Sequence, residues 1–207
     1  MYTIYFGTNN PTKVDYIKNV LKKSPVNIIG IYELENIDHN IDEDGKEPLE
    51  NARIKALHYY EQIKEPVFSI DSGLFFEKID CRDQPGTKIR RVNGIKLTDE
   101  EMVEYYSKLA RKYGGEIAGH YKNAICIIIN KKTIIEKDDR KIDSERFIIT
   151  AEPHHKRVEG WPLDSLSKEI RSGKYFYDIN RLWDNKNIEK EYEKIFKEAT
   201  GRMNEIK

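Results

Sequence analysis

The chain has few of the residues that staple small or secreted proteins together. Its 207 residues include two cysteines, Cys81 and Cys126, which are too few and too far apart for a disulfide framework or a zinc cluster. No apolar run approaches the ~20 residues that cross a bilayer, and the N-terminus has no basic segment followed by an apolar one. We therefore expect an unexported protein of the reducing cytoplasm.

An excess of charge of either sign is also absent. The 36 basic and 36 acidic residues give a formal net charge of zero. Such a chain has no general attraction for nucleic acid or for anionic membranes, so we expect neither among its partners. The length suits one large domain or two closely packed lobes that fold without disulfides or metal.

The first part of the chain predicts alternating strands and helices. Residues 2–7, 26–33 and 66–70 have strand patterns, and Asn10 fits an N-cap with Pro11 at the first helical position. The order of these elements is a βαβαβ-like start. The second helix of this start has helical spacing at Leu49, Ala52, Ala56 and Tyr59 or Tyr60.

The rest of the chain predicts a third helix, an antiparallel meander and a final amphipathic helix. Thr98 to Glu101 fits a capping box, and Gly114-Gly115 ends the helix that it begins. Apolar segments at 117–129, 133–136 and 146–152 suggest the meander. We expect a single α/β domain over residues 1–207, with two lobes that interrupt each other along the chain. The final helix carries Ile188, Tyr192, Ile195, Phe196 and Ala199.

A polar turn follows the first strand and runs from Thr8 to Lys13. A turn that leads into a helix offers unpaired backbone N–H groups and the positive end of the helix dipole, both of which suit phosphate. Lys13 adds a positive charge where a cation is mildly unfavourable unless an anion lies nearby. The alternative is that Asn10 is only a cap and Lys13 points to solvent.

A second polar break follows an apolar strand at Asp71, Ser72 and Gly73. Asp71 could hold a divalent cation or take a proton from water, and Ser72 could bond a phosphate oxygen or orient that water. Gly73 lets the backbone approach closely. The alternative is an ordinary Asp-Ser-Gly turn in which Asp71 caps the backbone. Two breaks of this kind suggest one shared site.

Further charged residues have both a functional and a plain interpretation. The acidic run Asp42-Glu43-Asp44 could supply oxygen ligands to Mg²⁺ or be simply solvated. Arg90 and Arg91 could contact phosphate oxygens or form surface ion pairs.

Other candidates are weaker. Glu50 and Asn51 lie in the first turns of a helix, where an acid needs no ligand to explain it. Trp161 could stack on a purine or pack beside proline. His154 and His155 are adjacent, so they are poorly placed to face one metal, and we expect them in a loop.

In their order along the chain, these motifs resemble the inosine triphosphate pyrophosphatase family, which removes pyrophosphate from deaminated purine nucleoside triphosphates such as ITP, dITP and XTP. Residues 8–13 are similar to the family's T-x-N-x-x-K turn, and residues 71–74 to its D-S-G-L motif. Residues 43–56, including Glu50-Asn51-Ala52-Arg53-Ile54-Lys55-Ala56, resemble E-x-G…E-N-A-x-x-K-A. Pro85-Gly86 with Arg91 resembles P-G-x-x-x-x-R, and Gly160-Trp161-Pro162-Leu163-Asp164 is a looser copy of G-F-G-Y-D.

The resemblance implies an elongated two-lobed α/β fold around a central twisted mixed sheet, with a cleft between the lobes and often a homodimer. It implies a Mg²⁺-dependent nucleoside triphosphate pyrophosphohydrolase in which Asp71 and Lys13 are catalytic and Glu43 and Asp71 bind the metal. The substrate-binding residues that it implies are Thr8, Asn10, Lys13, Ser72, Gly73, Arg91, Trp161, Asp164 and Lys186.

The C-terminal part departs from the family. The Ser-His-Arg triplet at the start of the family's last helix is missing, although Lys186 could replace the lysine before it, and Pro162 stands where a glycine is expected. Three functions stay open. They are hydrolysis of ITP, dITP or XTP, hydrolysis of a different or modified nucleotide, and non-catalytic nucleotide binding on the same fold.

Overall fold

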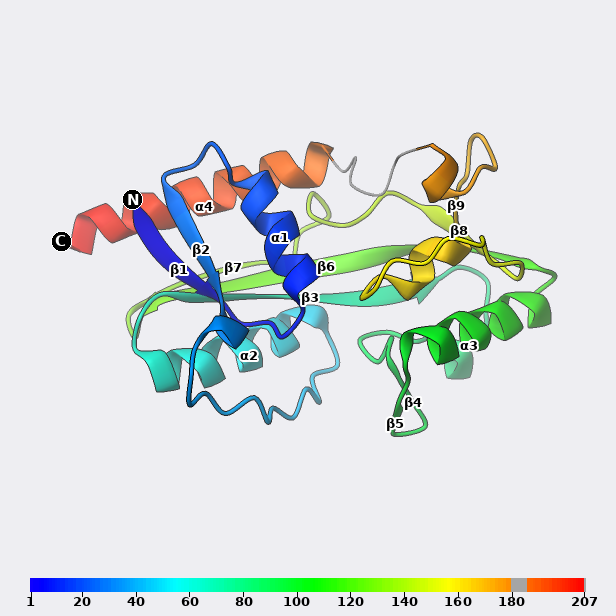
Figure 1. Cartoon of the computed structure of the whole chain (residues 1–207), viewed down its shortest axis with the longest axis horizontal. Coiled ribbons are helices and arrows are strands. Elements are labelled where there is room, and N and C mark those ends of the chain that lie inside the picture. The colour runs from blue at the N-terminus through cyan, green and yellow to red at the C-terminus, as the bar shows by residue number, and fades with distance from the viewer. Residues whose placement is uncertain (180–185, 207) are drawn as a thin grey trace. The chain divides into compact units, whose positions relative to one another are not determined.

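The computed structural model describes residues 1–179 and 186–206, with the side chain of Lys186 left out (Figure 1). Its helices are α1 (Pro11–Val20), α2 (Pro48–Ile63), α3 (Asp99–Lys112) and α4 (Lys186–Ile206). Its strands are β1 (Tyr2–Phe6), β2 (Val26–Gly30), β3 (Val67–Phe76), β4 (Arg91–Val92), β5 (Ile95–Lys96), β6 (Glu116–Asn130), β7 (Thr133–Lys137), β8 (Phe147–Thr150) and β9 (Ser167–Glu169). No helix in these described ranges has the length and apolar character that a membrane span requires.

The main sheet is mixed, as predicted for this α/β chain. Within the described residues it has seven strands in the order β2-β1-β3-β6-β8-β9, with β7 also paired to β6. Strand β1 runs parallel to both β2 and β3, which confirms the βαβαβ-like start. Strand β6 pairs antiparallel with β7 and β8, β8 pairs antiparallel with β9, and a separate two-stranded antiparallel sheet joins β4 to β5.

The contacts of the chain group into two compact units whose segments alternate along the sequence. Unit 1 comprises residues 1–72, 123–142 and 186–207, and unit 2 comprises residues 73–122 and 143–185. Strands β3 and β6 contribute residues to both units. Each unit has its own hydrophobic core.

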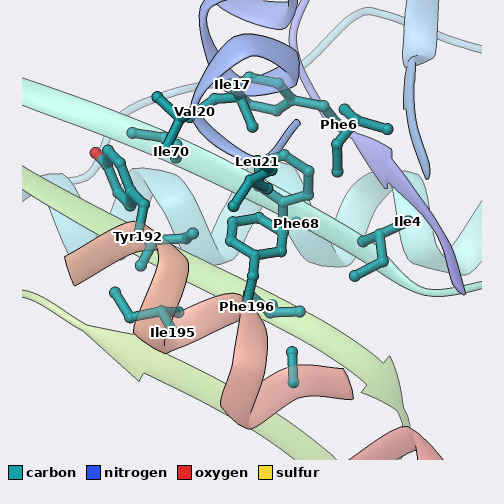
Figure 2. Close-up of a cluster of buried hydrophobic side chains, with 14 of the residues drawn as sticks. Ile4, Phe6, Ile17, Val20, Leu21, Phe68, Ile70, Tyr192, Ile195 and Phe196 are labelled. Carbon is teal, nitrogen blue, oxygen red and sulfur yellow. The ribbon is translucent and has the colours of Figure 1, made fainter. Parts of the chain in front are cut away.

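One face of the sheet in unit 1 is covered by α1 and α4. Phe6 of β1 stacks on Phe68 of β3 with ring centroids 4.3 Å apart, and Phe196 of α4 meets Phe68 edge-on at 4.9 Å (Figure 2). Helix α1 adds Ile17 and Val20 to this cluster. The predicted final helix is confirmed, because its apolar side chains are buried here at Ile188, Tyr192, Ile195, Phe196 and Ala199.

Helix α2 covers a different core cluster of unit 1. Its small and aromatic residues Ala52, Ala56 and Tyr59 are buried with Val67 of β3 and Cys126 of β6. Val67 lies here while its neighbour Phe68 lies in the other cluster, because successive side chains of a strand point to opposite faces. Unit 1 is therefore a sheet with helices on both faces, and α2 approaches from the side opposite α1 and α4.

Unit 2 packs α3 on its part of the sheet. Thr98 caps α3 by accepting the backbone N–H of Glu101 at 3.3 Å, which confirms the predicted capping box. Gly114 and Gly115 follow the helix with φ of 93° and 100°, values that favour glycine at a helix end. The core of unit 2 contains Leu74, Phe76, Met102, Val103, Tyr106, Ile117, Phe147 and Ile149.

Two predicted element boundaries and one predicted strand pairing differ from the structure. The strand predicted over 66–70 continues through Asp71 to Phe76, so the alternative of an Asp-Ser-Gly turn is excluded. Residues 31–33, predicted as strand, form a 3₁₀ turn in which Glu33 accepts the N–H of Gly30 at 2.8 Å. The predicted meander is confirmed for the antiparallel pairing of β6 with β7 and wrong for β8, which also pairs with β6, because β6 is long enough to hold both strands at residues 125–130 and 116–119.

Candidate active site

The turn between β1 and α1 is held by its own side chains. Asn10 accepts the backbone N–H groups of Thr12 at 3.0 Å and Lys13 at 3.4 Å, and Thr8 accepts that of Asn10 at 3.3 Å. Asn10 is therefore the N-cap of α1, as predicted, with Pro11 in the first turn. The phosphate-binding role of Thr8, Asn10 and Lys13 stays a prediction.

This turn packs directly on β3, two residues before Asp71. Gly7 donates its N–H to Phe68 at 2.8 Å, and Ser69 donates its hydroxyl to the Gly7 carbonyl at 3.0 Å. A Cβ atom on Gly7 would lie 2.3 Å from Ser69 Oγ and 2.7 Å from the Tyr59 ring, so only glycine fits. The close contact brings the two predicted polar breaks together within unit 1.

A buried ion pair lies at the centre of the site. Lys55 of α2 places its Nζ atom 2.5 Å from Asp71 Oδ1 and 3.0 Å from Glu43 Oε2. The side chains of Lys55 and Asp71 are each 11% exposed, and that of Glu43 is 40% exposed. Of the adjacent acids Asp42, Glu43 and Asp44, Glu43 is the one that reaches this lysine.

The charge state of Lys55 follows from these contacts. Burial alone lowers the pKa of an ammonium group, because it penalises the charged form. Here the negative charges and hydrogen bonds of Asp71 and Glu43 outweigh that penalty, so the pKa of Lys55 is raised. The site therefore contains a cation held by two carboxylates.

Asn51 ties the second oxygen of Asp71 to the acidic loop. Its Nδ2 donates to Asp71 Oδ2 at 3.2 Å, and its Oδ1 accepts the backbone N–H of Gly45 at 2.9 Å. Asn51 is 2% exposed. Its neighbour Glu50 has the plain role that the sequence allowed, because its carboxylate accepts the N–H groups of Lys46 and Glu47 at the start of α2.

Helix α2 directs three residues with the same spacing toward this site. Asn51, Lys55 and Tyr59 are four residues apart, which places them along one face of the helix. Burial and the nearby Glu43 raise the pKa of Tyr59, while Lys55 and a hydrogen bond with Asn9 oppose the shift. We predicted no role for Lys55, although it lies in the E-N-A-x-x-K-A motif. Its position four residues after Asn51, on the same face of the helix, was a signal that could have identified it.

Ser72 has a side-chain partner of its own. Its hydroxyl donates to Asn123 Oδ1 at 2.7 Å, and Asn123 Nδ2 donates to the Ile142 carbonyl at 2.6 Å. The hydrogen of Ser72 is therefore directed to β6, which leaves the oxygen lone pairs as the groups that could meet a donor.

The donor set fits a hard divalent cation. Glu43 and Asp71 already hold one positive group, the Lys55 ammonium, between their oxygens. In the described part of the chain, no group of three or more His, Cys, Asp or Glu side chains could hold a metal ion. Two carboxylates suit Mg²⁺, which commonly binds one or two of them and completes its shell with water and substrate phosphates.

Four of the predicted substrate-binding residues belong to unit 2. Gly73 packs against the chain itself, because a Cβ atom there would lie 2.7 Å from the Phe75 ring and 3.3 Å from the Gly86 carbonyl. Its neighbour Leu74 exchanges backbone hydrogen bonds with Gly86 at 2.9 and 3.1 Å. The D-S-G-L and P-G motifs are thus joined by an antiparallel bridge, and the close approach made by Gly73 is to Gly86.

Arg91 is exposed at the start of β4. Its neighbour Arg90 forms an ion pair with Asp99 at 2.7 Å, which supports the plain interpretation for that residue. His154 and His155 lie outside helices and strands, as predicted.

Trp161 and Asp164 lie at a short 3₁₀ helix, Pro162–Leu166. Both are half-buried, and burial raises the pKa of Asp164 from 3.8 to about 7. Lys186 begins α4, and its side chain lies outside the described part of the structure.

Comparison with known proteins follows the same motifs. Residues 4–146 match the model of the Ham1 family. A dITP/XTP pyrophosphatase of Caldanaerobacter subterraneus subsp. tengcongensis is 34% identical over 137 residues, which are 65% of this chain and 67% of that protein. A dITP/XTP pyrophosphatase of Borreliella burgdorferi is 27% identical over 171 residues, 80% of each chain.

A solved structure has the same fold. The HAM1 protein from Coxiella burnetii superposes with a TM-score of 0.71 at 20% identity, over 96% of this chain and 100% of that one. The family match ends at residue 146, before Trp161, Asp164 and the segment in which the Ser-His-Arg triplet is missing. The resemblance seen in the motifs is confirmed, and this chain belongs to the Ham1 family.

Proposed function

We propose that this protein is a Mg²⁺-dependent nucleoside triphosphate pyrophosphohydrolase that converts deaminated purine nucleoside triphosphates, such as dITP and XTP, to the monophosphate and pyrophosphate. The observation that carries the proposal is the buried contact of Lys55 with both Asp71 and Glu43, beside the capped N-terminus of α1. The relatives named dITP/XTP pyrophosphatase support the choice of substrate.

The chemistry needs what this part of unit 1 offers. Transfer at a phosphate depends on charge neutralisation and on the placement of the attacking water more than on covalent catalysis. Lys13 and the N-terminus of α1 supply positive charge for phosphate oxygens, and Lys55 supplies a second ammonium. Asp71 supplies the carboxylate that would accept a proton from water or bind the metal.

Glu43 and Asp71 would hold Mg²⁺. When bound, the ion would neutralise charge on the phosphates and on the attacking oxygen. Lys55 would then pair with the remaining carboxylate oxygens or with phosphate. Ser72 would offer its oxygen to a water molecule, because its hydrogen is committed to Asn123.

The experiment is pyrophosphate release from a panel of ITP, dITP, XTP, the ordinary nucleoside triphosphates and several modified nucleotides, with Mg²⁺ and with EDTA. We expect metal-dependent release from ITP, dITP or XTP well above release from ATP and GTP. A different preferred nucleotide would replace the substrate in the proposal and would fit the missing Ser-His-Arg triplet. Release from no nucleotide, together with nucleotide binding, would contradict the proposed enzyme.

The homodimer implied by the family resemblance is part of the proposal. Sedimentation equilibrium of the full chain tests it, because the monomer has a mass of 24.4 kDa. A single species at that mass across the concentration range would contradict the dimer.

A further inference from the structure

Asn51 joins two parts of the site that are otherwise held separately. Asp71 lies in a strand, where the backbone ladder fixes its position. Glu43 lies in the irregular segment between the 3₁₀ turn at Ile31–Glu33 and α2, where no ladder fixes it. The hydrogen bond from Gly45 to Asn51 anchors that segment two residues beyond Glu43.

The two halves of the Asn51 carboxamide face in different directions. A carboxamide has one oxygen that accepts and one nitrogen that donates. The oxygen binds the acidic loop at Gly45 N–H, and the nitrogen binds the carboxylate of Asp71. Neither an acid nor a hydrocarbon side chain of the same size could make both bonds.

We infer that Asn51 is a positioning residue that fixes the acidic loop against Asp71, so that the carboxylates of Glu43 and Asp71 face the same cation. This inference rests on the proposed function, because it assigns how the proposed metal ligands are kept together. Asn51 contacts neither phosphate nor metal in this role. It acts through Asp71 on one side and through the loop on the other.

Gly45 is the loop end of the bridge that runs from its N–H group through the Asn51 carboxamide to Asp71. A Cβ atom on Gly45 would lie 2.5 Å from Asn51 Oδ1, 2.8 Å from Glu50 Cβ and 3.0 Å from the backbone nitrogen of Asn51. Adding a methyl group there would force the loop and Asn51 Oδ1 apart, while Asn51 would keep the Nδ2 group that donates to Asp71. The loop end of the bridge can therefore be disturbed without removing the carboxamide of Asn51.

The test compares Asn51→Leu, Gly45→Ala and the double variant with the parent. Asn51→Leu removes both bonds while keeping the branched shape of the side chain, whereas Gly45→Ala is directed at the loop end. The matched control is Thr200→Val in α4, a buried polar residue that is 7% exposed and donates its hydroxyl within its own helix, to the Lys197 carbonyl at 3.0 Å.

Three quantities are measured for each variant. They are the dissociation constant for Mn²⁺ alone by electron paramagnetic resonance, the Mg²⁺ concentration that gives half-maximal pyrophosphate release, and the thermal unfolding midpoint in EDTA. Mn²⁺ is a suitable probe because it prefers the same carboxylate oxygens as Mg²⁺. Its binding is read without any turnover.

We expect each single variant to weaken Mn²⁺ binding by ~10-fold or more, the usual effect of removing a residue that orients a metal ligand. Both variants break the same bridge. We therefore expect the Mn²⁺ dissociation constant of the double variant to lie within about twofold of that of the more weakly binding single variant. Thr200→Val should lower the unfolding midpoint alone.

Several results would overturn the inference. The bridge would be purely structural if Asn51→Leu and Gly45→Ala had lower unfolding midpoints but Mn²⁺ dissociation constants within twofold of the parent's. Additive losses in the double variant, or a parent that does not bind Mn²⁺, would also overturn it. If Asn51→Leu does not fold, Gly45→Ala alone decides. A parent that binds Mn²⁺ but releases no pyrophosphate would contradict the proposed function, while the Mn²⁺ titrations would still test the bridge.

Discussion

Asp71 in unit 1 and Asp164 in unit 2 are both shielded from water, yet their surroundings differ. Asp71 is 8% exposed and contacts the ammonium of Lys55 and the amide of Asn51. Asp164 is half-buried, and within the described residues it forms no ion pair. Burial raises the pKa of Asp164 to about 7. In the pair with Asp71, the pKa of Lys55 is raised.

The comparison shows that burial alone does not decide whether a carboxyl group is charged. A buried carboxyl group without a cation favours its neutral form, whereas a buried carboxylate beside an ammonium keeps the charged pair. Unit 1 thus has a buried ammonium group in contact with Asp71 and Glu43, a set of groups that suits a metal and phosphates. Unit 2 has a group whose charge changes near neutral pH, which suits neutral polar contacts below that pH.

The largest expected effect is on turnover, when Asp71 loses its charge. Asp71→Asn should reduce pyrophosphate release by ~10³-fold, because the amide can neither accept the proton of water nor bind Mg²⁺ as a carboxylate does. The measurement is single-turnover release with saturating Mg²⁺. Asp138→Asn, at an exposed position, is the control and should leave the rate unchanged. Turnover that survives in Asp71→Asn would remove this aspartate from the mechanism.

The next effect concerns the cation in the same pair. Lys55→Met leaves two carboxylates beside each other, so we expect a loss of about 3 kcal/mol in the free energy of unfolding without metal. Mg²⁺ should restore part of this loss, because it can replace the ammonium between Asp71 and Glu43. Chemical unfolding with Mg²⁺ and with EDTA measures both values.

Lys18→Met is the matched control for this loss. Lys18 pairs with Glu33 at 3.3 Å, but the two side chains are 42% and 40% exposed, so the change should cost less than about 1 kcal/mol. Equal losses of unfolding free energy in the two variants would contradict the central place of the buried pair. So would a rescue by Mg²⁺ that is no greater for Lys55→Met than for Lys18→Met.

A smaller effect is expected from pH in unit 2. The pKa of Asp164 is about 7 in the folded chain against 3.8 ordinarily, so the folded state binds more protons between these values. Its contribution to stability is therefore greatest at low pH, falls as pH rises from about 4 to about 7, and is level above that range. Asp164→Asn should remove this slope, so that its unfolding midpoint exceeds that of the parent by a few degrees more at pH 8 than at pH 5. Parallel midpoint curves for parent and variant would show that Asp164 does not titrate in this range.

The smallest effects come from the two capped helices, one in each unit. Asn10→Ala and Thr98→Ala each remove a side-chain cap, and each should cost about 1 kcal/mol of stability. The two should differ in the KM for the nucleotide, which we expect to rise severalfold in Asn10→Ala alone, because only that cap lies in the proposed phosphate turn. Steady-state kinetics beside thermal unfolding separates the two effects. An equal KM in both variants would argue that Asn10 is only a cap.

Local patterns in the sequence predicted most of the elements correctly. Asn10 with Pro11 and Thr98 with Glu101 satisfy the backbone N–H groups of their own helices, so these boundaries need no distant partner. The spacing of apolar residues likewise identified the buried face of α4. The ordered motifs were enough to place the chain in its family.

Strand pairing was less accessible from the sequence. The continuation of β3 through Asp71 depends on partners elsewhere, because Asn51, Lys55 and Asn123 satisfy polar side chains that would otherwise favour a turn. The pairing of β8 with β6 also joins distant residues, and no local pattern specifies which strand is the neighbour.

By itself, the sequence determined the helices and their caps, the α/β class and the set of residue types available for phosphate and metal. Only the tertiary structure decided that Glu43 and not its neighbours contacts Lys55, that the same lysine contacts Asp71, and that Asn51 joins the segments of the two acids. The physical reason is distance along the chain. A cap or an apolar stripe is satisfied within a few residues, whereas the charge and position of a buried carboxylate depend on groups that folding alone brings within reach.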